Sequence, residues 1–119
     1  MPRPHERLDA WRLSHELSTS LHARTDNFPA DERYRMVPQM RRAASSVPAN
    51  IAEGAGAPSR REFGRYLSIA NASLNELAHW LREARELGYI TTGEYWGFDN
   101  RVSRIGRTLW KLRQWLDRP

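Results

Sequence analysis

The sequence predicts an all-α protein, an antiparallel four-helix bundle of up-down-up-down topology that occupies residues 1–119 as one domain. Three observations predict this fold. Apolar residues recur at helical spacing in four segments, no segment alternates apolar and polar residues as a half-buried strand does, and the connecting loops are short. The expected helices cover roughly residues 6–25, 31–53, 59–88 and 92–117.

The first expected helix follows an arm, residues 1–5, that holds two prolines and no apolar anchor and is therefore expected to be loose. Residues 6–25 contain no Gly or Pro, and Leu13, Leu17 and Leu21 fall on one helical stripe. Because Pro29 disfavours helical backbone at the residue before it, the helix is expected to end ahead of that proline.

The second expected helix contains two prolines. Pro38 lies near its start, where a missing N–H matters less, whereas Pro48 lies in its interior and predicts a kink. Gly54 is placed as the residue that stops the helix. The face expected in the core consists of Met36, Met40, Ala43, Ala44, Val47 and Ile51.

Two capping boxes mark the starts of the last two helices, since Ser59 precedes Glu62 by three residues and Thr91 precedes Glu94 by three. Gly88 is placed to end the third helix. The apolar face of that helix covers about 160° of arc, which suggests more than one neighbour. This face comprises Phe63, Tyr66, Leu67, Ile69, Ala70, Leu74, Leu77, Trp80, Leu81 and Leu87. The core stripe of the fourth helix comprises Phe98, Val102, Ile105, Leu109, Leu112 and Leu116.

The composition is basic and free of cysteine. The net charge is +5, the isoelectric point is about 10.4, and 18 of the 19 basic residues are arginine. This composition fits either a genome biased towards arginine codons or a phosphate-binding surface. With 28% charged residues, no membrane span is expected. The absence of a secretory leader and of cysteine is compatible with a cytoplasmic location, which is the expected one.

Two surfaces are candidates for contact with partners. Tryptophans that lie off the core stripe of the fourth helix indicate a subunit interface, although they could instead pack on a neighbouring helix or stack on nucleobases. The candidate interface residues are Trp96, Trp110, Trp80 and Ile69. Beside the two tryptophans of the fourth helix runs a basic stripe, which is either a solvated face or a surface that follows phosphates. The stripe comprises Arg101, Arg104, Arg107 and Lys111.

The third helix also opens with an unusual set of cations. Arg60, Arg61 and Arg65 lie near its start, where the helix dipole disfavours positive charge. Either a partner contact or tolerance of a small cost explains this placement.

Catalysis finds no support in the sequence. The four histidines are scattered, there is no His-Glu-x-x-His motif, and there is no pair of Glu-x-x-His motifs such as a di-iron bundle requires. We therefore expect no enzyme activity, no metal and no cofactor.

The second helix resembles the signature of the four-helix bundle family that is also called the 23S rRNA intervening-sequence or S23 family. The resemblance extends from about residue 7 to 116, and its specific part is the run Gln39, Arg41, Arg42, Ala43, Ala44, Ser46, Pro48, Asn50, Ile51, Ala52, Glu53 and Gly54. It implies a cytosolic bundle that assembles into a ring-shaped homopentamer. It also implies kinship with accessory proteins of diversity-generating retroelements, which bind nucleic acid and a reverse transcriptase. No catalytic residue is inherited from the family.

Four polar residues of this signature lie along one strip of the second helix: Gln39, Ser46, Asn50 and Glu53. They are interpreted as partners in hydrogen bonds between helices, with an exposed recognition strip as the alternative. The function expected is a non-enzymatic oligomeric scaffold that binds RNA or single-stranded nucleic acid, or a ribonucleoprotein partner. The alternative is an assembly protein with no nucleic-acid role.

Overall fold

The structure, a computed structural model that describes all 119 residues, contains four α-helices and no strand. This confirms the all-α class and the four predicted helices. The helices are α1 (Asp9–Thr25), α2 (Met36–Ala55), α3 (Arg60–Glu86) and α4 (Thr92–Leu116), and the 3-10 helices η1 (Pro4–Arg7) and η2 (Ala30–Glu32) precede α1 and α2.

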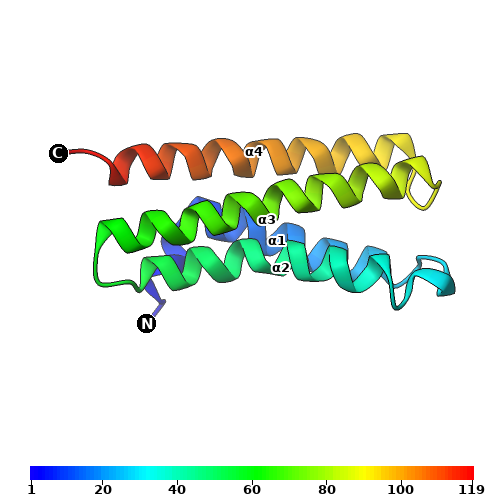
Figure 1. Ribbon diagram of the computed structural model, residues 1–119, viewed down its shortest axis with the longest axis horizontal. Helices are drawn as coiled ribbons and strands as arrows, with labels where there is room; N and C mark the ends of the chain where they lie inside the picture. The colour runs from blue at the N-terminus through cyan, green and yellow to red at the C-terminus, as the bar shows by residue number, and fades with distance from the viewer.

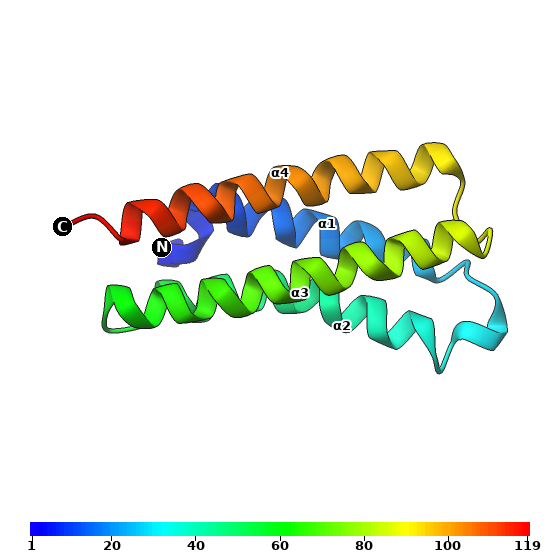
Figure 2. The ribbon, with the colours of Figure 1, turned by 45° about the horizontal axis from the view of Figure 1, so that its top comes forward.

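Consecutive helices run in opposite directions along one long axis, which gives the predicted up-down-up-down order (Figure 1). The bundle measures 48 × 23 × 23 Å, and both chain termini lie at the same end as the α2–α3 loop (Figure 1). Figure 2 shows α1 and α4 as one layer and α2 and α3 as the other. The α2–α3 contact is the most extensive in the bundle, whereas α1 and α4 meet along the least extensive seam.

Buried apolar side chains fill the space between the four helices. The predicted face of α2 is buried throughout, and so are most of the stripes predicted for the other three helices. The buried face of α3 is narrower than its sequence indicates, because Ile69 and Leu87 are exposed and Tyr66 and Trp80 are only half-buried.

The N-terminal arm is more ordered than predicted. Residues 4–7 form η1, and α1 begins at Asp9 rather than near residue 6. The His5 ring meets Trp11 edge-on with centroids 4.9 Å apart, and the His15 ring stacks on Trp11 at 4.8 Å. These aromatic contacts supply an anchor that the apolar pattern of residues 1–5 lacks, and residues 4 and 5 of the expected loose arm belong to η1.

The start of α2 also differs from the prediction, because residues 30–32 form η2 and the α-helix begins at Met36. Glu32 explains this break. Its buried carboxylate accepts hydrogen bonds from the hydroxyl of Tyr89 at 2.6 Å and from Arg35, and a longer one from the amide of Met36 at 3.4 Å. The hydrogen bonds, that from Arg35 first, hold the pKa of Glu32 below its usual range.

Both prolines of α2 are accommodated within the helix. Pro38 is its third residue, where the backbone amide has no partner in the preceding turn. Pro48 is buried in the interior, and α2 continues through it to Ala55. The kink expected at Pro48 stays a prediction.

Gly54 does not stop α2, contrary to the sequence prediction, because the helix runs past it and ends with Gly56 as its C-cap. Gly54 is buried against α3 instead. A Cβ atom at this position would lie 2.7 Å from Cδ1 of Phe63 and 2.9 Å from Cβ of Tyr66. The glycine is therefore required by the close approach of two helices and not by the backbone conformation of a helix end.

The ends of α3 follow the predicted signals. Ser59 accepts a hydrogen bond from the amide of Glu62 at 3.2 Å, although the reciprocal bond of a full capping box does not form. Gly88 has a positive φ of 78°, and the amide of Tyr89 bonds to the carbonyl of Ala84 at 2.8 Å. This pattern is a Schellman motif, which confirms Gly88 as the residue that ends α3.

The start of α4 has a complete capping box, and an arginine from another helix reinforces it. Glu94 accepts from the amide of Thr91 at 2.9 Å, and Thr91 accepts from the amide of Glu94 at 3.0 Å. Arg24, near the end of α1, donates to both carboxylate oxygens of Glu94 at 2.7 and 3.2 Å. These hydrogen bonds, that from Arg24 first, lower the pKa of Glu94 to about 2.

We expect Gly54→Ala to lower the free energy of unfolding by about 1–3 kcal/mol, because the added methyl overpacks the α2–α3 contact. Gly97→Ala is the matched control. Gly97 also lies inside a helix, but a Cβ there meets nothing within 4 Å. The control should raise the free energy of unfolding by about 0.5–1 kcal/mol. Urea titrations of both variants measure these changes, and equal effects would contradict the close-packing role of Gly54.

Glu94→Gln should lower stability at neutral pH by on the order of 1 kcal/mol, because it removes the charge that pairs with Arg24 while glutamine still caps the helix. The pKa of Glu94 is depressed in the folded protein, so its contribution is fully present above the unfolded value of about 4.3 and is lost as pH falls towards about 2.

The free energy of unfolding of wild type and Glu94→Gln, measured at one protein concentration from pH 7 to pH 2, should therefore converge at the acid end. A difference between the two proteins that does not change with pH would show that charge pairing at Glu94 is not what stabilises this junction.

Candidate nucleic-acid interface

The predicted basic stripe lies on the solvent side of α4. Arg104, Arg107 and Lys111 are exposed and Arg101 is half-buried. None of the four makes an ion pair or a side-chain hydrogen bond within the chain, whereas several other arginines do. Residues 101–111 span about 15 Å of helix axis, so the stripe presents a short row of unpaired cations.

Two hollows lie between this stripe and α1. Arg101 and Arg104 line one of about 120 Å³ together with Glu16. Lys111 lines another of about 210 Å³ together with Asp9. Both of these carboxylates lie near the guanidinium of Arg12, with Asp9 at 3.3 Å and Glu16 at 3.7 Å. Both acids are thus paired with Arg12, whereas none of the four cations of the stripe pairs with a carboxylate of the chain.

The four candidate interface residues do not form a single patch. Trp96 and Trp110 lie on α4 and are 51% and 62% exposed. Trp80 and Ile69 lie on α3, along its edge with α2. The indole of Trp80 donates to Glu76 at 3.0 Å, and Glu76 also accepts from Arg42 of α2 at 3.3 Å. The structure therefore places the predicted interface residues on two separate surfaces of the bundle.

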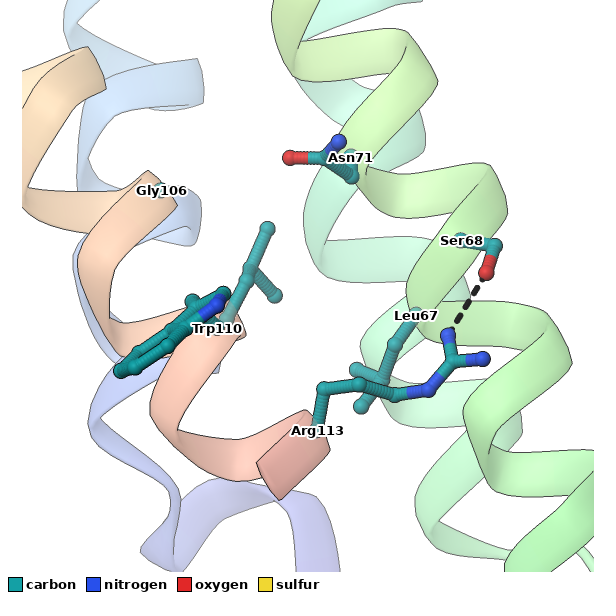
Figure 3. Close-up of a pocket in the computed structure, with 7 residues that line it drawn as sticks. Leu67, Ser68, Asn71, Gly106, Trp110 and Arg113 are labelled. Atoms are coloured by element: carbon teal, nitrogen blue, oxygen red, sulfur yellow. Dashed lines mark hydrogen bonds between the residues drawn. The ribbon is translucent and has the colours of Figure 1, made fainter. Parts of the chain in front are cut away.

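A hollow of about 320 Å³ lies beside Trp110, between α3 and α4 (Figure 3). Asn71 points its amide into the gap between the helices (Figure 3). Arg113 crosses from α4 to α3 and donates to Oγ of Ser68 at 2.7 Å and to the carbonyl of Gly64 at 2.8 Å. The sequence patterns did not indicate this site, because its residues come together only when the register between α3 and α4 is known. The lining residues are Leu67, Ser68, Asn71, Gly106, Leu109, Trp110 and Arg113.

The comparisons with known proteins place this bundle in a family. The family model of the 23S rRNA-intervening sequence protein matches residues 6–111.

This chain belongs to the 23S rRNA-intervening sequence protein family.

The solved structures include a similar member of the S23 ribosomal protein family, a protein of unknown function from Bacteroides thetaiotaomicron. It aligns with a TM-score of 0.79 and 27% identity over 87% of this chain and 97% of that one. A search of curated proteins finds no match. The family assignment agrees with the resemblance seen in the sequence, and the known structure has the same helical fold.

The polar residues of the family signature make contacts both within α2 and across to α3. Ser46 and Ser73 of α3 share a hydrogen bond of 2.8 Å, and the amide of Asn50 donates to the carbonyl and hydroxyl of Ser46 at 2.8 and 3.0 Å. Gln39 accepts from Arg42, which also reaches Glu76. Glu53 is exposed and makes no hydrogen bond. Three members of the strip thus contribute to a hydrogen-bonded seam between α2 and α3.

Arg41, another signature residue, secures the turn after α1. It donates to Thr25 at 2.9 Å, to the carbonyl of His22 at 3.0 Å and to Asp26 at 2.7 Å. The remaining signature residues lie on the buried or half-buried side of α2: Ala43, Ala44, Pro48, Ile51, Ala52 and Gly54. In this structure, the signature residues of the 23S rRNA-intervening sequence protein family pack and form hydrogen bonds within the bundle.

The titratable groups with shifted pKa values belong to structural contacts. The pKa of Tyr89 is raised chiefly by its hydrogen bond to Glu32, and those of Arg24 and Arg35 are raised by hydrogen bonds to Glu94 and Glu32. These groups lie away from the basic stripe.

No three His, Cys, Asp or Glu side chains converge as metal ligands would. One Glu-x-x-His sequence occurs, at residues 76–79, but its glutamate is bound to Trp80 and Arg42. None of the four helices is both long enough and apolar enough to cross a bilayer.

Proposed function

We propose that this member of the 23S rRNA-intervening sequence protein family is a non-enzymatic oligomeric scaffold that binds RNA or single-stranded nucleic acid through the basic stripe of α4. The observation that carries the proposal is the row of four unpaired cations, three of which line hollows whose carboxylates already pair with Arg12. Phosphate oxygens would supply the partners that the subunit itself does not.

The proposed binding has little sequence preference. The stripe offers guanidinium and ammonium groups, which recognise the backbone charge common to all nucleic acids. Ser103 beside the stripe has only a small hydroxyl. The exposed indole of Trp110 provides a flat apolar surface and a single N–H donor, which is too few polar groups to distinguish several bases. Affinity would therefore come mainly from electrostatics.

We also propose that the chain assembles into a homopentameric ring. Exposed or half-buried aromatic and apolar side chains occupy two different surfaces, Trp96 and Trp110 on α4 and Ile69 and Trp80 at the edge between α3 and α2. Contact between two unlike surfaces is a heterologous interface, which is completed when a cyclic ring closes. The number five comes from the resemblance noted in the sequence. Five subunits at +5 each would carry +25 and would concentrate positive potential on a shared surface.

A second candidate function is an assembly protein with no nucleic-acid role. The observation that favours it is that the family signature packs and bonds inside the subunit, while the basic stripe lies outside that signature. Under this alternative the arginine-rich composition is incidental, and the tryptophan surfaces retain their role in assembly.

The double variant Arg104→Gln, Arg107→Gln should weaken binding of single-stranded RNA and flatten its salt dependence. Each lost phosphate contact changes the slope of log affinity against log salt by about 0.7, so two lost contacts change it by about 1.4. Filter binding at several salt concentrations measures the slope.

The matched control is Arg33→Gln, Arg82→Gln, which removes the same charge. Arg33 makes no ion pair or side-chain hydrogen bond, and Arg82 pairs only with the exposed Glu86. The control should keep the wild-type slope. If wild type shows no binding at low salt, or if both double variants behave alike, the stripe is a solvated face and the assembly function is preferred.

Trp110→Ala should reduce the mass of the oligomer more than it reduces the stability of the subunit, because truncation of a tryptophan at an interface costs a few kcal/mol. Light scattering in moderate salt gives the mass, and circular dichroism gives the helicity and melting temperature. Leu109→Ala is the matched control, since Leu109 is the buried neighbour and should lower the melting temperature. A wild-type protein that is monomeric at micromolar concentration would refute the assembly proposal.

A further inference from the structure

The first turns of α3 carry cations where a helix favours acidic residues. Helix N-termini bear partial positive charge, so Arg60, Arg61 and Arg65 are unfavourably placed unless something compensates them. The structure gives two of them an aromatic neighbour. The guanidinium of Arg60 lies 5.2 Å from the ring centroid of Trp115, and that of Arg65 lies 4.6 Å from the ring centroid of Tyr66.

Arg61 has no such compensation. Its side chain is exposed and makes no ion pair, hydrogen bond or cation–π contact within the chain. The backbone amides of residues 60 and 61 are also without partners in the chain, as is usual for the first turn of a helix. The first turn of α3 therefore has several N–H groups, from the Arg61 side chain and from the backbone, that have no acceptor within the chain.

An arginine of α4, Arg113, lies beside Arg60 and Arg61. Arg60, Arg61 and Arg113 line a hollow of about 300 Å³ at the end of the bundle where α3 begins and α4 ends, and Gly64, Leu116 and Asp117 complete its lining. Arg113 is held in position by its hydrogen bonds to Gly64 and Ser68.

The lining of this hollow has an excess of positive charge. Asp117 is the only carboxylate among the lining residues, and it lies 3.8 Å from Nε of Arg113. Arg60 uses one nitrogen in a long hydrogen bond of 3.4 Å to the carbonyl of residue 118. The lining therefore holds three guanidinium groups and one carboxylate, a net formal charge of +2.

We propose that this hollow is a phosphate-binding site, which takes a phosphate group with at least two unesterified oxygens. Guanidinium groups from two helices present N–H donors in planar pairs that match the oxygens of a phosphate, and the positive end of α3 adds favourable potential. Arg61 is the main ligand because all of its donors are free. Arg113 has a fixed side chain and contributes charge at a defined position.

This site is distinct from the basic stripe. Arg113 and Lys111 are two positions apart on α4 and therefore point about 160° apart around the helix. The site thus goes beyond the proposed function. Two sources of the ligand share the required chemistry: the terminal phosphate of a nucleic acid and free inorganic phosphate.

The first experiment uses the full chain and two hexathymidylates with a fluorophore at the 3′ end, one bearing a 5′-phosphate and the other a 5′-hydroxyl. Fluorescence anisotropy should show about tenfold tighter binding of the phosphorylated oligonucleotide. Arg61→Gln should abolish this preference. Arg33→Gln should retain it, because it removes the same charge from an exposed arginine in the α1–α2 connection, which lies at the opposite end of the bundle from the α2–α3 loop (Figure 1).

The second experiment measures the melting temperature in sodium phosphate and in sodium chloride of equal ionic strength. A stabilisation specific to phosphate that is lost in Arg61→Gln, together with equal binding of the two oligonucleotides, supports the site and identifies its ligand as free phosphate. A preference for the phosphorylated oligonucleotide identifies a nucleic-acid terminus.

The proposal is overturned if wild type shows neither the preference nor the stabilisation, or if Arg61→Gln and Arg33→Gln reduce them equally. A failure of the proposed function is distinguishable from a failure of this site. The double variant Arg104→Gln, Arg107→Gln should weaken binding of both oligonucleotides and leave the ratio of their two affinities unchanged.

Discussion

The close approach of α2 and α3 is the constraint on which the rest of the bundle depends. It requires small residues along the seam, and Gly54 shows how little space is left, since even a methyl group would lie under 3 Å from Phe63 and Tyr66. The Ser46–Ser73 hydrogen bond fixes the register of the two helices along the same seam. This explains why the family signature is concentrated on α2: its residues determine how α3 sits, and α3 in turn positions α4 through Arg113.

The other side of the bundle is built differently. The seam between α1 and α4 is the least extensive, and hollows rather than packed side chains separate parts of the two helices. Polar and charged groups can therefore gather there at low cost to the core. Close packing is therefore required mainly in the layer of α2 and α3. The layer of α1 and α4 can carry exposed polar and aromatic groups, and the unpaired cations and exposed tryptophans of α4 lie there.

The features that could be predicted from sequence are those decided by local interactions. Capping residues at 59 and 91 and the glycine at 88 marked helix ends correctly, because their partners lie within five residues. The start of α2 could not be predicted, since Glu32 is bonded to Tyr89, 57 positions away. Gly54 was misassigned because a glycine can serve either a turn or a close contact, and only the position of α3 decides between them.

The candidate sites divide in the same way. The basic stripe could be predicted, since its members share one face of one helix. The split of Trp110 and Trp80 between two surfaces, and the convergence of Arg113 on Arg61, required knowledge of how α3 and α4 are aligned.

Arginine contacts secure both ends of α4. Arg24 holds its first turn through Glu94, and Arg113 in its last turn is bound to the backbone and a hydroxyl of α3. These two contacts oppose sliding of α4 along its axis, although the seam with α1 between them is the least extensive in the bundle. The cations of α4 consequently lie at one height relative to α3, so a pattern of positive charge set by the helix rise would recur unchanged in every copy of the chain.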